Sequence, residues 1–258
     1  MIDVQQISFS IGTKILVKEV SLQIVPGEFV VIMGANGAGK STLLKMMAGS
    51  LYPTAGNLFF KGKEISQYKT EELAKQRAVL SQHYHISFPM LAREIVMMGR
   101  YPYFDHQPKP ADEKWVTACL ERMQVLSLAD RDYNTLSGGE AQKVQMSRVL
   151  AQIGETSPEQ TKLLLLDEPV SHLDIKYQHQ LLQQARTLCQ NHTAVAAVLH
   201  DINLALKYAD RILFMKDGQI IHSLPKQEPI TIEMLKEIFD VDANIFDIPG
   251  EDRKFISF

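Results

Sequence analysis

Eight residues near the N-terminus have the types and spacing that hold phosphate groups. Residues 34–41 read Gly-Ala-Asn-Gly-Ala-Gly-Lys-Ser, which matches the pattern G-x-x-x-x-G-K-[ST]. Glycines let backbone N–H groups approach phosphate oxygens, Lys40 adds a positive charge on the outer phosphates, and Ser41 offers Mg²⁺ a hydroxyl ligand. The predicted phosphate contacts are Gly34, Ala35, Asn36, Gly37, Ala38, Gly39, Lys40, Ser41 and Thr42.

A chance match is the alternative to this interpretation. The loop, however, follows the apolar run at residues 29–33 and opens a helix predicted over residues 41–50. A helix beginning there adds the positive end of its dipole to the site. The strand before and the helix after the loop therefore favour a phosphate-binding loop over chance.

A pair of carboxylates follows a second apolar run. Four leucines, residues 163–166, precede Asp167 and Glu168. In an open parallel sheet the ligand site lies at the carboxyl ends of the strands. Asp167 is thus placed to hold Mg²⁺, directly or through water, and Glu168 to polarise a water for in-line attack on a γ-phosphate. A solvated acidic turn is the alternative.

The elements that must position these residues alternate between strands and helices. The apolar patterns predict strands at 2–10, 22–25, 28–33, 57–60, 163–166 and 193–199, and helices at 41–50 and 177–191. Residues 90–150 are mostly helical in pattern, with a proline-rich loop at 101–110. This order predicts an α/β fold with a mainly parallel sheet and a helical insertion.

Composition excludes several classes of protein. The 258 residues are 45% hydrophobic and 22% charged, which excludes disordered, collagen-like and coiled-coil chains. A net charge of −3 argues against a strongly basic nucleic-acid footprint. Two cysteines, Cys119 and Cys189, cannot form a disulfide framework and fit a reducing cytosol. No apolar run is long enough to cross a bilayer and no signal peptide is evident, so a membrane role would require a partner.

A third motif identifies a family. Residues 136–140, Leu136, Ser137, Gly138, Gly139 and Glu140, precede an amphipathic helix. With the two motifs above, residues 1–224 resemble the nucleotide-binding subunit of ABC transporters. Other marks of the family occur in its order: Gln82 in the Q-loop, Ser171, His172, Leu173 and Asp174 in the D-loop, and the switch histidine His200.

The resemblance implies an architecture. It is an α/β P-loop NTPase fold with a RecA-like, mainly parallel core, an N-terminal antiparallel β subdomain and an inserted α-helical subdomain. Residues 1–258 would be a single ABC ATPase domain, with an ATP-binding core at 1–85 and 155–224 and a helical signature subdomain at 86–154. Residues 225–258 are a tail without an assigned role.

The resemblance also implies how the residues work. Two copies would dimerise head to tail and bury two ATP molecules, with Ser137 and the amides of Gly138 and Gly139 on the γ-phosphate of the facing site. Glu168, His200 and Gln82 are the implied catalytic residues. Ser41, Gln82 and Asp167 are the implied Mg²⁺ ligands, and the D-loop aspartate would couple the two sites. A plain structural role for His200, at the end of a buried strand, is the alternative.

One position departs from the family. An aromatic residue, often tyrosine, stacks on adenine near residue 11, where this sequence has Ile11. Isoleucine supplies only apolar contact, whereas an aromatic stack on a base is worth about 1–3 kcal/mol. Phe9, two residues earlier on the same strand face, is a possible substitute. Weaker or less base-selective nucleotide binding is expected.

The transported substrate is indicated only by resemblance. Residues 82–89 and 94–102 resemble ATPases of the importer group for iron-siderophores, vitamin B12 and haem. Residues 139–145 and the polar loop at 153–161 resemble the hemin importers most, ahead of those for ferric siderophores and B12. The implied partners are two transmembrane permease subunits and an extracytoplasmic binding protein. The implied location is the cytoplasmic face of the inner membrane, as a peripheral subunit.

Two features near this stretch have competing interpretations. Residues 101–104 are either an ordinary surface loop or the edge of a groove for a permease helix. His83 and His85 suggest metal or haem ligation, but they lie beside Gln82, where transported substrate should not enter.

Two other functions compete with a transport motor. A non-transport ABC ATPase acting on ribosomes or DNA would usually carry a second such domain or a long coiled coil. A P-loop kinase would leave residues 136–140 unexplained. Neither is favoured, and no nucleic-acid partner is expected.

Overall fold

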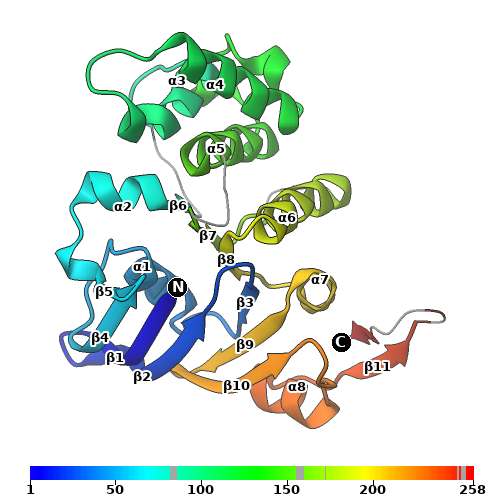
Figure 1. Cartoon of the computed structure of the whole chain (residues 1–258). Helices are drawn as coiled ribbons and strands as arrows, with labels where there is room; N and C mark the ends of the chain where they lie inside the picture. The colour runs from blue at the N-terminus through cyan, green and yellow to red at the C-terminus, as the bar shows by residue number, and fades with distance from the viewer. Residues whose placement is uncertain (82–85, 155–159, 172, 249, 251–253) are drawn as a thin grey trace. The chain divides into compact units, whose positions relative to one another are not determined.

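The computed structural model describes residues 1–81, 86–154, 160–171, 173–248, 250 and 254–258. Within it the chain divides into two compact units (Figure 1). Unit 1 comprises residues 1–68 and 194–258, and unit 2 comprises residues 69–193. The predicted division into core, helical subdomain and tail follows other boundaries and stays a prediction.

Unit 1 is built mainly from strands. An antiparallel sheet has the order β2-β1-β4-β5, a mixed sheet the order β10-β9-β3-β8, and β11 pairs with β12. The strands are β1 Ile2–Ile11, β2 Lys14–Ile24, β3 Phe29–Met33, β4 Ala55–Phe60, β5 Lys63–Glu64, β8 Ala194–Val198, β9 Arg211–Lys216, β10 Gln219–Pro225, β11 Asn244–Asp247 and β12 Lys254–Ser257. The helices are α1 Lys40–Met47, η1 Ile65–Gln67, α7 Ile202–Tyr208 and α8 Ile232–Phe239.

The central strand of unit 1 is β3, whose five residues are all buried. It runs parallel to β8 on one side and to β9 on the other. A strand flanked and covered in this way needs apolar side chains at every position, which explains the uninterrupted run Phe-Val-Val-Ile-Met. The expected α/β arrangement with parallel strands is thus confirmed.

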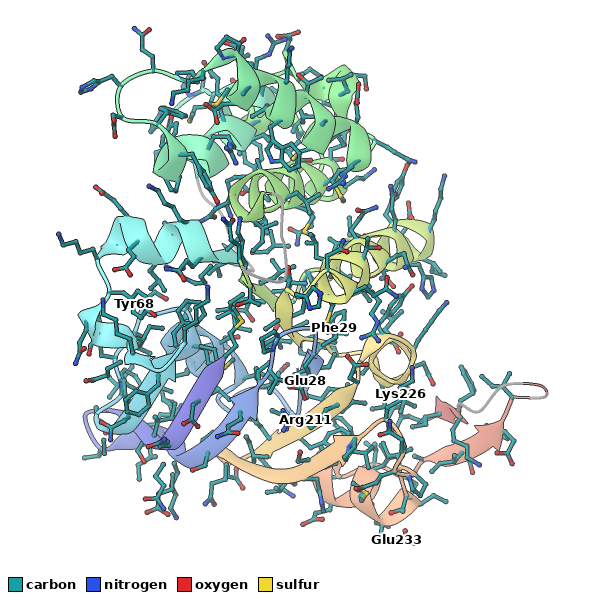
Figure 2. All side chains as sticks on the ribbon, in the orientation of Figure 1. Glu28, Phe29, Tyr68, Arg211, Lys226 and Glu233 are labelled. Carbon is teal, nitrogen blue, oxygen red and sulfur yellow. The ribbon has the colours of Figure 1, made fainter. Side chains whose placement is uncertain are left out.

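Polar contacts fix the beginning of β3. The Phe29 amide donates to Asp210 Oδ2 at 2.9 Å, and Arg211 Nε donates to Glu28 Oε1 at 2.8 Å (Figure 2). Both contacts join chain segments more than 180 residues apart. They set the register in which Val30 lies opposite Arg211.

Strand β2 is much longer than the strand predicted at 22–25. It begins at Lys14, and its pairing with β1 is interrupted by register shifts. Glu19 in β2 has a left-handed backbone, with φ 49°. Such bulges insert extra residues and break the two-residue alternation on which strand prediction relies.

Unit 2 is mainly helical. Its helices are α2 Thr70–Gln76, α3 Ala92–Met97, η2 Met98–Tyr103, α4 Pro110–Arg122, η3 Leu126–Leu128, η4 Tyr133–Thr135, α5 Gly138–Ile153 and α6 Ile175–Gln190. Helices α3, α4 and α5 pack on one another, and α5 also contacts β6 (Arg77–Leu80). β6 runs parallel to β7 (Leu163–Asp167). Residues 101–103, predicted as loop, lie instead in the 3₁₀ helix η2, where Tyr103 packs under Arg100.

Both cysteines lie buried in unit 2 and neither is part of a disulfide. Burial raises the pKa of the Cys119 thiol to about 12, so the thiol stays protonated and unreactive at neutral pH. None of the helices within the described ranges combines the length and apolar character that crossing a bilayer requires.

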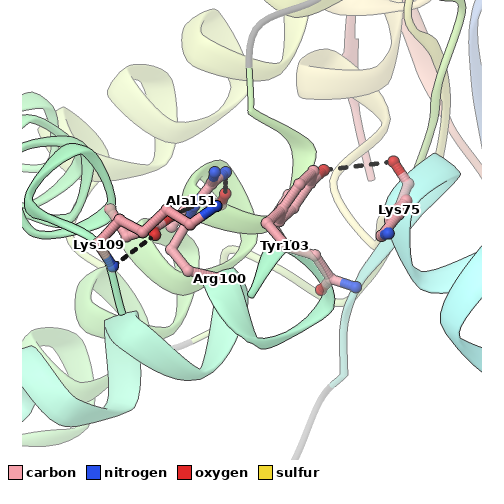
Figure 3. Close-up of polar contacts among 7 residues, drawn as sticks. Lys75, Arg100, Tyr103, Lys109 and Ala151 are labelled. Carbon is pink, nitrogen blue, oxygen red and sulfur yellow. Dashed lines mark hydrogen bonds and ion pairs between the residues drawn. The ribbon is translucent and has the colours of Figure 1, made fainter. Parts of the chain in front are cut away.

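A buried ion pair holds the helices of unit 2 together. Arg100 Nε donates to Asp112 Oδ1 at 2.9 Å, and Arg100 Nη1 donates to the Ala151 carbonyl at 3.0 Å (Figure 3). The second oxygen of Asp112 accepts the Lys109 amide at 3.0 Å. Burial alone would raise the pKa of Asp112, but the bonds from Lys109 and Arg100 outweigh burial and lower it.

Changing Asp112 to asparagine is therefore expected to lower the free energy of unfolding at pH 7 by about 3 kcal/mol, because a buried guanidinium loses its counter-charge. Since the pKa of Asp112 is lowered on folding, its contribution is present above the ordinary carboxyl pKa of about 4. The contribution is lost as the pH falls through the folded pKa. Urea unfolding at neutral and acid pH should show that Asp112→Asn lowers the free energy of unfolding less at acid pH than at pH 7.

The exposed pair between Arg93 and Asp130 is a matched control. Changing Asp130 to asparagine should cost less than about 1 kcal/mol at pH 7, because water screens exposed pairs. An equal loss of unfolding free energy in the two variants would show that the buried Arg100–Asp112 pair stabilises the fold no more than an exposed pair does.

Candidate functional site: phosphate loop, carboxylates and signature

The predicted phosphate loop turns between β3 and α1 in unit 1. Residues 35–37 are exposed, whereas Lys40 is 5% exposed. Lys40 Nζ donates to the carbonyls of Gly34 at 2.8 Å and Ala35 at 2.9 Å. The ammonium group therefore lies within the turn of the loop, where a phosphate chain in contact with the loop would meet it.

Two glycines in the loop leave no room for a side chain. A Cβ built on Gly34 would lie 2.0 Å from the Met215 carbonyl oxygen, and one on Gly39 would lie 2.3 Å from that of Leu16. Both residues also have positive φ, 147° and 97°. Backbone crowding thus requires glycine at both positions. Gly39 is the N-cap residue of α1 and makes no side-chain capping bond, so no capping side chain covers the first amides of that helix.

His200 lies at the same sheet edge as the phosphate loop. Ile32 pairs with Val198 across the parallel strands β3 and β8. Gly34 lies two residues after Ile32, and His200 lies two residues after Val198. Both residues therefore follow the carboxyl ends of neighbouring strands. The histidine is exposed, and the side chain of the next residue, Asp201, caps α7.

The residues expected near adenine lie at the end of β1. Phe9 pairs with Val17 and Ser10 with Ile15, so β2 advances two residues where β1 advances one. The bulge is therefore in β2, and β1 keeps Phe9 and Ile11 on the same face. Val17 lies on that face, and its Cγ2 is 3.4 Å from the position that a Cβ on Gly39 would occupy. Ile11 is 63% exposed.

Changing Ile11 to tyrosine is expected to tighten ATP binding by about 1–3 kcal/mol, because a stacked ring replaces an aliphatic contact. The unmodified chain should bind ATP and GTP with similar, modest affinity. Nucleotide titration of both forms, with Phe9→Ala as a companion, measures this directly. Tight ATP binding by the unmodified chain, with clearly different KM values for ATP and GTP, would contradict the expectation.

The two carboxylates lie at the end of β7 in unit 2. Asp167 is the last residue of this fully buried strand and is 5% exposed. Glu168 has φ 49°, a left-handed backbone that costs free energy in a non-glycine residue. The Ser171 hydroxyl donates to the Glu168 carbonyl at 3.2 Å, which supports this turn. The predicted placement of both acids at a strand end is as observed.

The Q-loop glutamine and part of the D-loop have no described position. Gln82 and His172 lie outside the described residues, as do His83 and His85. Leu80, which ends β6, pairs with Leu166 of β7. In the D-loop, Leu173 is buried, and Asp174 caps α6 by accepting the Tyr177 amide at 3.1 Å.

The signature residues form the beginning of α5. Ser137 is its N-cap, and Glu140 completes a capping box: the Ser137 amide donates to Glu140 Oε2 at 2.9 Å, and the Glu140 amide donates to Ser137 Oγ at 3.4 Å. Bonds from the Ser137 amide and hydroxyl lower the pKa of Glu140. Ser137 and Gly138 are exposed at the positive end of a 16-residue helix, while Leu136 and Gly139 are partly exposed.

Sequence reasoning missed the residues that tie the signature helix to the acidic turn. Gln142 Nε2 donates to the carbonyl of Pro169, next to Glu168, at 2.9 Å, and Lys143 Nζ lies 3.2 Å from the centre of the Tyr177 ring. Three residues on, Gln145 accepts from Arg148 Nε, and Arg148 also donates to the Val79 carbonyl of β6. Polar side chains recurring on one face of an otherwise buried helix were the available signal.

The described residues thus fall into two groups. Unit 1 holds the phosphate loop and His200 at one sheet edge. Unit 2 holds Asp167, Glu168, Asp174 and the signature, with α5 bonded to the acidic turn. The first group offers amides and an ammonium to phosphate, and the second offers carboxylates and a helix N-terminus.

Known ATP-binding proteins are similar to this chain over most of its length. Residues 17–171 match the family model described as ABC transporter. The chain is 40% identical over 251 residues to the hemin import ATP-binding protein HmuV of Methylobacillus flagellatus, covering 96% of this chain and 93% of that protein. It is 42% identical to the protein of the same name from Plesiomonas shigelloides, covering 95% and 97%.

Solved structures show the same fold. A dimeric, post-hydrolysis structure of the ATP-binding cassette MJ0796 with ADP and Pi is 27% identical, with a TM-score of 0.77 over 89% of this chain and all of that one. An ABC transporter in an inward-facing conformation gives a TM-score of 0.80 at 24% identity, covering 99% and 95%. The cassette fold predicted from the sequence is confirmed. The chain is an ATPase and belongs to the ATP-binding proteins of the ABC transporter family.

Proposed function

We propose that this chain is the ATP-hydrolysing motor subunit of a bacterial hemin importer. The observation that carries the proposal is the identity of 40% and 42%, over at least 95% of the chain, to proteins named for hemin import. The identity extends beyond the ATP-binding motifs shared by the whole family. Ferric siderophore and vitamin B12 are the alternative substrates.

In this proposal, ATP binds with its phosphates on the loop at residues 34–42. Backbone amides and Lys40 hold the β- and γ-phosphates, and the buried position of Lys40 pre-orients its ammonium group. Glu168 accepts the proton of the attacking water. His200 hydrogen-bonds the γ-phosphate, and Gln82 orients the water.

The residues also suit a magnesium ion. Ser41 provides a hydroxyl and Asp167 a carboxylate, and hard oxygen donors are the ligands that Mg²⁺ prefers. Asp167 is the last residue of a buried strand, and ligands of open parallel sheets bind at the carboxyl ends of strands. With Gln82, these residues would hold Mg²⁺, which neutralises charge on the phosphates.

The signature acts on the ATP of a second copy. Ser137 is exposed at the beginning of α5, and the capping box keeps Glu140 ionised and directed at the N-cap. The first amides of α5 suit a γ-phosphate presented by a partner, and the Ser137 hydroxyl would contact it by exchanging its bond to Glu140 Oε2 for one to the phosphate. The cassette MJ0796, 27% identical, is dimeric in two structures. Asp174 lies in the same dimer interface in this proposal.

A groove in unit 2 that is lined by both aromatic and charged side chains suits the permease. The groove has a volume of about 710 Å³, and the rings that line it include Phe88, Tyr101 and Phe104. Phe88 is 62% and Tyr101 55% exposed. Tyr101 and Phe104 meet edge to face with centroids 5.7 Å apart, which gives one wall of the groove a fixed shape. We assign it to a cytoplasmic helix of the permease.

Changing Tyr101 to alanine is expected to reduce recovery of the permease with this chain about tenfold or more, because aromatic anchors dominate such interfaces. The ATPase rate of the isolated chain should remain normal. Co-purification from membranes measures recovery, and Tyr52→Ala, an exposed ring in unit 1, is the control. Full recovery with Tyr101→Ala would contradict the assignment.

The substrate is tested in the assembled complex. The chain is purified from detergent-solubilised membranes of iron-starved cells, and its co-purifying subunits are identified. The complex is reconstituted in vesicles, and its ATPase rate is measured with the binding protein loaded with haem, with ferric siderophore or with B12.

Two transmembrane permease subunits and stimulation by the haem-loaded binding protein would support the proposal, including a peripheral position at the cytoplasmic face of the inner membrane. Stimulation only by siderophore or B12 would retain the importer and replace the substrate. Ribosomal or DNA-bound partners would overturn import altogether.

A further inference from the structure

The tail of the chain is hydrogen-bonded to α7, the helix that follows the switch histidine. Asn203 Nδ2 donates to the carbonyl of Ile256 in β12 at 2.9 Å, and the Ile256 amide donates to Asn203 Oδ1 at 2.8 Å. The side-chain amide thus pairs with the backbone of β12 as a neighbouring strand would. Only a group that donates and accepts at once can do this.

Asn203 is also hydrogen-bonded to Asp201, the residue after His200. Asp201 Oδ1 accepts the Asn203 amide at 2.7 Å and the Leu204 amide at 3.1 Å. On the other side of the histidine, the Leu199 amide donates to the Ile32 carbonyl of β3 at 3.3 Å. His200 therefore lies between two anchored neighbours: the Leu199 amide is hydrogen-bonded to β3, and the Asp201 side chain is hydrogen-bonded to the first turn of α7.

The tail is itself firmly anchored in unit 1. Ile256 is 2% exposed. The rings of Phe258, Phe239 and Phe214 form a chain of edge-to-face contacts, with centroids 5.9 Å and 6.4 Å apart. Phe214 pairs with Met33, the residue before the phosphate loop. The tail thus connects the base of that loop with the helix after His200.

We propose that Asn203 is a positioning residue, through which the hairpin formed by β11 and β12 holds the first turn of α7 and so sets His200 against the γ-phosphate. The inference rests on the role proposed above for His200. It assigns strands β11 and β12 a task in hydrolysis. β12 contacts α7 through Asn203, and Phe258 reaches Phe214 of β9 through Phe239 of α8.

The contacts predict a specific kinetic defect. Without the amide of Asn203, β12 no longer restrains α7, and a misplacement of His200 by about 1 Å is enough to slow the reaction roughly tenfold to a hundredfold. The phosphate loop keeps its own bonds. Asn203→Ala should therefore lower kcat about tenfold while KM for ATP changes less than about twofold.

The test uses the full chain and four variants: Asn203→Ala, Asn203→Asp, His200→Ala and the double variant His200→Ala with Asn203→Ala. Asn203→Asp keeps the size of the side chain but can only accept, so it should fold and still lower kcat. Phe246→Ala, on the exposed face of the same hairpin, is the matched control and should keep the normal rate. Hydrogen exchange of the Ile256 amide reports the bond directly.

A positioning role predicts that the double variant is no slower than His200→Ala alone, and that the Ile256 amide exchanges faster in Asn203→Ala. Losses that multiply in the double variant would indicate general destabilisation and overturn the inference. So would a normal kcat for Asn203→Ala when His200→Ala is slow. A normal kcat for His200→Ala would refute the role of the histidine itself, and the inference with it.

Discussion

Changing Glu168 to glutamine is expected to lower the ATPase rate about a hundredfold or more, because general base catalysis typically contributes about 10²–10⁴-fold. Glutamine has the same shape but cannot accept a proton at neutral pH. The turn at residue 168 depends on hydrogen bonds from the Ser171 amide and hydroxyl to the Glu168 backbone carbonyl, which the substitution leaves in place. ATP binding should therefore remain normal.

Because bound ATP then persists, Glu168→Gln should also accumulate as a closed dimer. Size-exclusion chromatography with ATP and Mg²⁺, beside a single-turnover hydrolysis assay, measures both effects. Glu121→Gln, an exposed acid on α4, should behave like the unmodified chain. A variant that hydrolyses normally, or that stays strictly monomeric with ATP, would refute Glu168 as the base.

Changing Lys40 to alanine is expected to abolish transport and to weaken ATP binding at least about tenfold, since hydrogen bonds to charged groups are worth about 1.5–3 kcal/mol each. The ammonium group lies within 2.9 Å of two carbonyls inside the loop. Its loss removes the positive charge from the point where the outer phosphates bind. Titration with a fluorescent ATP analogue and a transport assay measure the two effects.

Lys45, an exposed lysine in the last turn of the same helix, is the control for Lys40. Lys45→Ala should leave binding and transport near normal. Unchanged turnover in Lys40→Ala would refute the phosphate-loop assignment. The two large effects are also distinct from each other, because Glu168→Gln loses hydrolysis with binding intact, whereas Lys40→Ala loses binding.

The sequence alone determined the parts of the site whose structure is local. The phosphate loop, the acid pair at a strand end and the helix start at Ser137 each include hydrogen bonds between residues at most six positions apart. Their spacing in the chain therefore predicts their geometry. The buried strands β3 and β7 were equally evident, since full burial requires apolar side chains throughout.

Only the tertiary structure decided the rest. The bulges that lengthen β2 break its alternation, and β9, β10, α8 and the final hairpin were not predicted. Arg148 bonds a carbonyl 69 residues away, and Asn203 bonds one 53 residues away. Such bonds form because packing brings distant segments together, and spacing along the chain does not encode that proximity.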